Sequence, residues 1–220
     1  MHANALKHLQ LFLSNYYDEK SKLDIAEIGS LNVNGSLKNT ALPYAKTYTG
    51  VDFSKGQDVD YVLDDPYFFP FKNDTFDLVI TSSCFEHSEM FWLTFLESLR
   101  ILKPTGLLWY TVPGAWMGYH QYPVDCWRFY PDSGIALEKW AKRNGYKTCL
   151  LESYMAFPSA KGECSDAVAI FLKDETYNQT FPKRIIKSSV PYKDYINGHI
   201  DEIKSTYPIH PHQLGTEYVY

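Results

Sequence analysis

The chain has 220 residues, a formal net charge of -5 and a pI of about 5.8. A mildly acidic chain with no long run of Lys and Arg argues against a nucleic-acid partner, and no apolar run approaches the ~18 residues of a membrane span. The four cysteines, Cys84, Cys126, Cys149 and Cys164, form no Cys-x2-Cys pair, and the N-terminus has no signal pattern. We therefore expect a reduced, cytoplasmic protein.

Helix-like and strand-like segments alternate along most of the chain. Apolar residues recur at helical spacing over 2–20, and further helices are expected to open at 35–39 and to cover 89–102 and 131–144. Asp132 or Ser133 is the expected cap of the last helix, and Gly145 is its expected stop. The expected strands are short apolar runs at residues 25–28, 47–51, 61–63, 76–81, 107–112, 147–151 and 166–172.

This alternation predicts an α/β fold with a doubly wound, mostly parallel sheet. The last two strands are separated by a loop short enough for antiparallel pairing. Residues 1–172 form the predicted domain. Residues 173–220 do not continue the alternation of helices and strands and are rich in Pro and Tyr. We therefore expect an irregular extension that packs on the core or joins subunits of a homo-oligomer.

The segment from Leu23 to Asp52 predicts one half of a nucleoside pocket. A short apolar strand ends in Glu27 and Gly29, and a second strand ends in Asp52, whose carboxylate can accept hydrogen bonds from ribose hydroxyls. A dinucleotide turn would carry a second glycine where Leu31 stands, so the ligand need not have a pyrophosphate. The acid Glu27 instead favours a positively charged ligand.

From these residues onward the chain resembles the class I S-adenosylmethionine-dependent methyltransferases, over roughly residues 23–172. Glu-Ile-Gly-Ser followed by Asn-Gly-Ser is similar to their first motif, and Gly-Val-Asp to their second. The stretches 64–77, 83–87 and 102–108 are similar to the later motifs, in the same order. The order of five motifs on the predicted elements is more specific than any one of them.

The resemblance implies S-adenosyl-L-methionine as cofactor and assigns residues to its parts. Glu27, Gly29 and Ser30 would border the methionine part, Asp52 would hold the ribose, and Phe53 would pack beside the adenine. The adenine amino group would be contacted by Asp64 or Asp65, and the sulfonium would lie beside Ser83.

The loop after the strand at 107–112 faces the transferred methyl group, because ligands lie beyond the carboxyl ends of the strands. His120 is the expected general base, since its usual pKa suits proton abstraction near neutrality. Asp125 either orients that imidazole or acts as the base itself. Arg128 either clamps an anionic group of the substrate or simply pairs with Asp125. Flat or wall-forming contacts to the acceptor are expected from Trp116, Tyr119, Tyr122 and His87.

The stretch His120-x2-Pro-x-Asp-x-Trp-Arg-Phe resembles a subgroup of these enzymes linked to surface-polysaccharide and other glycan pathways, which implies O-methylation of a sugar or sugar conjugate. No metal site is predicted. A divalent cation could use Asp125, Glu163 and Asp166 as oxygen ligands, but no compact motif collects them, and a zinc site of Cys126, Cys164 and His120 is disfavoured.

Three alternatives remain open from sequence. The acceptor could be a lipid, quinone, phosphate or amine, or the chain could be a binding subunit of the same fold without turnover. A nicotinamide oxidoreductase is disfavoured, because the Tyr16-x3-Lys20 pair precedes the first strand, where no crevice forms.

Overall fold

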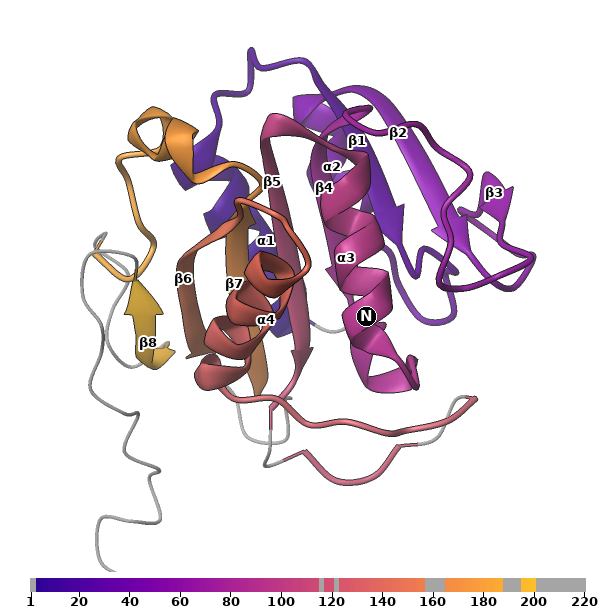
Figure 1. The fold of residues 1–220 in the computed structure, drawn as a ribbon. Coiled ribbons are helices and arrows are strands. Elements are labelled where there is room, and N and C mark those ends of the chain that lie inside the picture. The colour runs from indigo at the N-terminus through magenta and orange to yellow at the C-terminus, as the bar shows by residue number, and fades with distance from the viewer. Residues whose placement is uncertain (1–2, 115–116, 121–122, 157–164, 188–194, 201–220) are drawn as a thin grey trace, which may run out of the picture.

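The computed structural model describes residues 3–114, 117–120, 123–156 and 165–187, and the backbone of residues 195–200. Within these residues the strands form one sheet in the order β3-β2-β1-β4-β5-β7-β6-β8 (Figure 1). The strands are β1 (Leu23–Ile28), β2 (Ala45–Asp52), β3 (Tyr61–Val62), β4 (Phe76–Ser82), β5 (Leu102–Pro113), β6 (Cys149–Ala156), β7 (Asp166–Leu172) and β8 (Tyr195–Ile200).

The first five strands pair in parallel, whereas β7 runs antiparallel to both β5 and β6. The predicted fold class, a doubly wound and mostly parallel sheet with a late antiparallel strand, is confirmed. Parallel neighbours require crossover helices, which bury both faces of the sheet and explain why β4 and the second half of β5 are buried and largely apolar.

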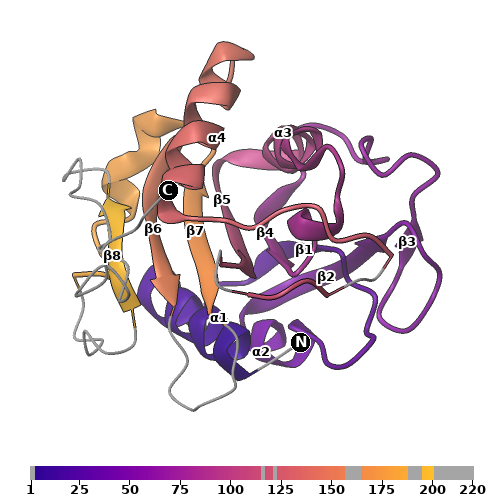
Figure 2. The ribbon, with the colours of Figure 1, turned by 90° about the horizontal axis from the view of Figure 1, so that it is seen from below.

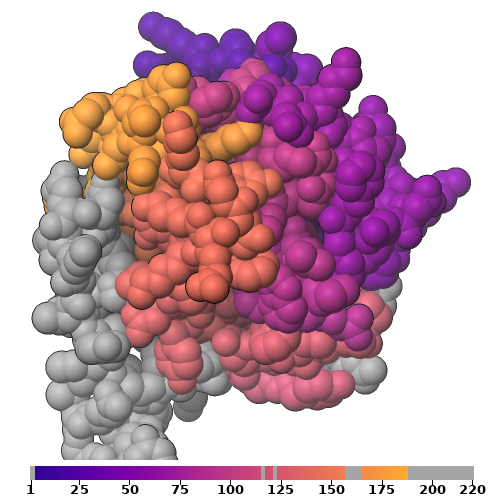
Figure 3. Space-filling view, viewed as in Figure 1, coloured from indigo at the N-terminus to yellow at the C-terminus, as the bar shows by residue number. Residues whose placement is uncertain are grey.

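Helices cover both faces of the sheet and separate the core into two layers (Figures 1 and 2). On one face α1 (Ala3–Tyr16) and the short α2 (Lys38–Ala41) pack with side chains such as Trp109. On the other, α3 (Phe91–Ile101) and α4 (Pro131–Arg143) pack with side chains such as Phe171, and they dominate that face in Figure 3. No helix among the described residues is long and apolar enough to cross a membrane.

Local differences from the expected elements have local causes. The helix expected to open at 35–39 is only one turn, α2, followed by the 3-10 turn η1 (Leu42–Tyr44), in which Pro43 occupies an early position. β5 begins directly after α3, and its residues 103–106 bulge because the register with β4 shifts between Phe76 and Leu78. The cap of α4 is Tyr130, whose N–H donates to the Ser133 hydroxyl at 3.2 Å, so neither Asp132 nor Ser133 is the cap residue itself.

The first part of the extension is tied to the core. It forms the 3-10 turn η3 (Glu175–Thr180), and later β8 pairs antiparallel with β6. The fully buried carboxylate of Glu152, on β6, accepts hydrogen bonds from the Tyr16 hydroxyl at 2.6 Å and from the backbone N–H groups of Ile185 at 2.9 Å and Ile186 at 3.0 Å.

Candidate active site

A cavity of about 680 Å³ lies at the carboxyl ends of β2, β1, β4 and β5. These strand ends are neighbours in the sheet, spaced by roughly 4.8 Å each, so the cavity extends across the sheet from the end of β2 to the end of β5. The loop between β5 and α4 crosses these strand ends and contributes Met117, His120 and Val124 to the lining (Figure 2).

The turn after β1 brings the backbone against the cavity. Gly29 has a φ of +77°, and a Cβ at this position would lie 2.7 Å from the Cβ of Cys84, so both the conformation and the space require glycine. The hydroxyl of the buried Ser30 lines the cavity without a hydrogen-bond partner among the described residues. A buried hydroxyl of this kind is expected to meet a polar ligand group.

Glu27, at the end of β1, supplies a carboxyl group inside the cavity. Its side chain is buried and accepts a hydrogen bond from the Tyr48 hydroxyl. Burial raises the pKa of Glu27 to about 7. A bound cation would favour the ionised form, so the group suits a ligand that carries positive charge.

Asp52, at the end of β2, is held by the backbone around it. Its two carboxylate oxygens accept hydrogen bonds from the N–H groups of Leu31 at 3.1 Å and Ser54 at 2.9 Å. Each oxygen retains further acceptor capacity for the hydroxyls of a ribose. Phe53 follows it at the cavity wall and is 51% exposed.

The end of β4 is strained where it meets the cavity. Ser83 has a φ of +50°, a conformation that residues with a side chain rarely adopt and that is concentrated at functional sites. The next residue, Cys84, also lines the cavity. Burial raises the pKa of its thiol to about 12, which favours the neutral thiol over the nucleophilic thiolate.

Glu86 and two histidines meet at the β5 end of the cavity. The fully buried Glu86 has its Oε1 3.6 Å from Nε2 of His87 and 3.9 Å from Nε2 of His120. Burial raises the pKa of Glu86 to about 8 and lowers the pKa of His87 below its ordinary value. Sequence reasoning missed Glu86, although an acid directly before His87 and just after a strand end was a usable signal.

The same loop is held by the ion pair of Arg128 and Asp125. The Arg128 guanidinium donates to both Asp125 carboxylate oxygens at 2.5 Å, and to the carbonyl groups of Met117 at 3.0 Å, Gly118 at 2.6 Å and Trp127 at 2.7 Å. These bonds use all five N–H donors of an arginine.

Asp125 also accepts a hydrogen bond from the backbone N–H of His120 at 2.6 Å. The hydrogen bonds from Arg128 lower the pKa of Asp125 from its ordinary value to about 2, which makes this carboxylate a weak base. The geometry therefore favours the pairing of Asp125 and Arg128 that the sequence left open, with both residues positioning the loop.

The structure brings most of the predicted site residues to one cavity and leaves others outside it. Lining residues are Glu27, Gly29, Ser30, Asp52, Phe53, Ser83, His87 and His120. Asp64 and Asp65 are exposed and do not line it, nor do Tyr119, Asp125 and Arg128. Trp116, Tyr122, Glu163 and Cys164 lie outside the described residues. The contacts of all these residues with ligands stay predictions.

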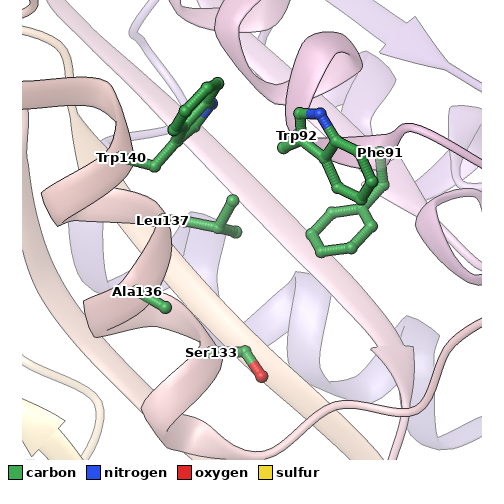
Figure 4. A pocket seen from close by; sticks show the side chains of 6 residues that line it. All are labelled: Phe91, Trp92, Ser133, Ala136, Leu137 and Trp140. Carbon is green, nitrogen blue, oxygen red and sulfur yellow. The ribbon is translucent and has the colours of Figure 1, made fainter. Parts of the chain in front are cut away.

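A second, smaller hollow of about 340 Å³ lies between α3 and α4 (Figure 4). Its lining is mostly apolar, from residues such as Phe91, Trp92 and Trp140. It offers no acid or base among its lining residues, so the chemistry of the described residues is concentrated in the larger cavity.

Comparisons with known proteins agree with this site. Residues 27–110 match a family model described as a methyltransferase domain, and among curated protein sequences none matches the chain. The matched segment begins at Glu27 and ends within β5, so it contains the strand ends from β1 to β4 that line the cavity.

Solved structures share the fold at low sequence identity. A 1,6-didemethyltoxoflavin-N1-methyltransferase of Burkholderia thailandensis, solved with 1,6-didemethyltoxoflavin and S-adenosylhomocysteine, has a TM-score of 0.57 at 14% identity, covering 79% of this chain and 78% of its own. A phosphoethanolamine N-methyltransferase of Haemonchus contortus has a TM-score of 0.53 at 16% identity, and the match covers 77% of this chain and 53% of that enzyme. The [4+2]-cyclase SpnF has a TM-score of 0.55 at 13% identity, and the match covers 77% of this chain and 81% of the cyclase.

The cyclase shows that this fold alone does not specify methyl transfer. Over residues 27–110, which are less than half of the chain, the sequence is similar to a methyltransferase domain, and the solved structures share the fold.

Proposed function

We propose that this chain transfers a methyl group from S-adenosylmethionine to a hydroxyl oxygen of a small molecule, and that the acceptor is a sugar or sugar conjugate of polysaccharide biosynthesis. The observation that carries the proposal is the arrangement of the cavity. Its β2 end holds Asp52 and the orphaned Ser30 hydroxyl, whereas its β5 end holds Glu86, His87 and His120.

The cofactor residues fit the two ends of an S-adenosylmethionine molecule. Asp52 can bind the ribose, and the carboxyl of Glu27 can offset the positive charge of the amino-acid part. The bound cofactor supplies an electrophilic methyl group on a positively charged sulfur. Gly29 and Ser83, both with a positive φ, line the same cavity.

The acid and base groups at the β5 end are what an oxygen acceptor requires. A hydroxyl must lose its proton as its oxygen forms a bond to the methyl carbon and the carbon–sulfur bond breaks. His120, which is half exposed and lines the cavity, can take this proton at Nε2. Because Asp125 is bound by Arg128, it supports His120 rather than replacing it.

Support for a sugar acceptor comes from the sequence resemblance at 120–129 and from aromatic side chains beside the loop. Trp127 is 37% exposed and Tyr119 is 73% exposed, both outside the lining of the cavity but on the loop that crosses it, and flat apolar faces of this kind suit sugar rings. The amine and heterocycle acceptors named for the structural neighbours define the competing acceptor classes.

Calorimetry of the full chain with S-adenosylmethionine and S-adenosylhomocysteine is the first test, and absence of binding by both would refute the proposal. Transfer of a labelled methyl group is then measured across a panel of sugars, nucleotide sugars, amines and quinones. Methylation of sugar hydroxyls is expected. Transfer to amines alone would refute the oxygen acceptor, and cofactor binding without any transfer would favour a binding subunit.

A further inference from the structure

We propose that Glu86, His87 and His120 bind a divalent transition-metal ion at the β5 end of the cavity. One potential ligand atom from each of the three side chains lies within 4.8 Å of the others. Two imidazoles and one carboxylate form a donor set that suits zinc and its first-row neighbours. The three residues come from two segments, η2 (Phe85–His87) and the loop after β5.

The hydrogen bonding of His87 fixes which ring nitrogen faces the cluster. Its Nδ1 contacts the carbonyl oxygen of Val124, which can only accept, so Nδ1 carries the proton. In the neutral ring the lone pair is then on Nε2, and this atom lies 3.6 Å from Oε1 of Glu86. A backbone carbonyl on the other nitrogen is the usual support of a metal-binding histidine.

Glu86 lacks the partners that a buried carboxylate needs. Both of its oxygens are buried, and no other described residue donates a hydrogen bond to them. The two imidazole nitrogens, at 3.6 and 3.9 Å from Oε1, are too far away to donate one. A buried carboxylate without donors is costly, and a cation between these three atoms would remove that cost.

His120 can present the same nitrogen as His87. Its Nδ1 lies 3.3 Å from Nη2 of Arg128, but the two protons of Nη2 point to closer partners, the Gly118 carbonyl and the Asp125 carboxylate. Nδ1 can therefore carry its own proton toward Oδ2 of Asp125, which is 3.7 Å away. That tautomer leaves the lone pair of Nε2 facing Glu86.

The two separations from Glu86 need only a small adjustment, and the ligand atoms of the two histidines lie within 4.8 Å of each other. Ligands about 2.1 Å from a tetrahedral metal are about 3.4 Å from one another. The measured separations of 3.6 and 3.9 Å exceed this value slightly, and His120 is on a loop with a half-exposed side chain. Three protein ligands also leave a coordination position open toward the cavity, as catalytic rather than structural metal sites do.

The role of this metal, though not its binding, rests on the proposed function. A hydroxyl of the acceptor bound at the open position would lose its proton to water more readily, because the metal stabilises the oxygen anion that attacks the methyl carbon. In the metal-bound protein His120 is then a ligand, and the proton passes to water instead of to its Nε2.

The test is a titration of the chelator-treated full chain with Zn²⁺ by calorimetry and with Co²⁺ by visible absorption. We expect one ion per chain and the absorption of a four- or five-coordinate Co²⁺ site. Glu86→Gln and His120→Asn should each lower the affinity by at least about tenfold. The matched control is Glu89→Gln, which removes a carboxylate three positions further along the chain but outside the cluster.

Circular dichroism and binding of S-adenosylhomocysteine, measured without metal, show whether each variant is folded. A folded wild-type chain that binds no ion, or a Glu86→Gln variant that binds as wild type does, would overturn the metal site. Cofactor binding in either case would leave the proposed function standing. If the metal binds but the cofactor does not, the proposed methyl transfer is refuted and the metal site stands.

Discussion

The two ends of the cavity are built in different ways. The end at β2 and β1 is made largely by backbone: the turn at Gly29, the amides that hold Asp52 and the strained Ser83 at the end of β4. The end at β5 is made by side chains on a loop, which Arg128 holds in place. The sheet fixes the backbone at the first end, whereas the loop side chains at the second end can be substituted without altering the fold. Substitutions at the two ends should therefore affect different steps.

The largest effect is expected from His120→Ala. Loss of this side chain removes proton transfer, whether the imidazole acts as a base or as a metal ligand, so turnover should fall by about a hundredfold or more. Affinity for S-adenosylhomocysteine should stay near the wild-type value, because His120 lies at the other end of the cavity from Asp52. Equal losses of turnover and affinity would show that the two ends are not independent.

Asp52→Ala should have the opposite profile. It removes the proposed ribose contact, and hydrogen bonds to a charged group contribute about 1.5–3 kcal/mol, so cofactor affinity measured by calorimetry should fall roughly 10- to 100-fold. The matched control is Asp18→Asn, at an exposed acid outside the cavity, which should leave the affinity unchanged. The same measurement on Asp64→Asn and Asp65→Asn tests the adenine contact, and a loss of affinity in one of them would place adenine beside that residue, as the sequence resemblance implies.

Arg128→Lys tests the loop. A lysine keeps the charge but cannot reproduce the five hydrogen bonds that connect Arg128 to Asp125 and to three backbone carbonyls. Turnover should fall about tenfold through misplacement of His120, with cofactor affinity unchanged. If turnover is insensitive and only the KM of the acceptor rises, Arg128 contacts the substrate directly.

The pH dependence of cofactor binding should give an effect no larger than that of Arg128→Lys. Because burial raises the pKa of Glu27 to about 7, the free protein carries a proton on this carboxyl at about pH 6 and has lost it by about pH 8. A cationic ligand prefers the ionised form, so affinity should rise as pH increases, by about tenfold across this range. Glu27→Gln should remove the rise, and a rise that survives in this variant belongs to another group.

Sequence patterns suffice to bring Gly29 and Asp52 to one cavity, because both lie at the ends of strands whose apolar runs are local signals. They also suffice for the mostly parallel sheet with its antiparallel pair, whereas the order of the strands depends on tertiary contacts that the apolar runs do not encode. The acceptor end is harder, since His120 reaches Glu86 from a loop distant in sequence, and an isolated Glu does not show that it will be buried. The pairing of Arg128 with Asp125 is foreseeable from their spacing, but the carbonyl contacts that use the remaining donors depend on the loop backbone.

The carboxylate of Glu152 limits where the chain can be truncated without exposing the core. Two of its three donors, the amides of Ile185 and Ile186, come from beyond the predicted domain boundary at 172. A truncated protein ending there would leave a charge buried beneath α1 with only the Tyr16 hydroxyl to stabilise it, and would uncover the core side chains that Phe181 and Ile185 now contact. The first residues of the extension thus complete the core and its hydrogen bonds, and a shortened protein should retain them.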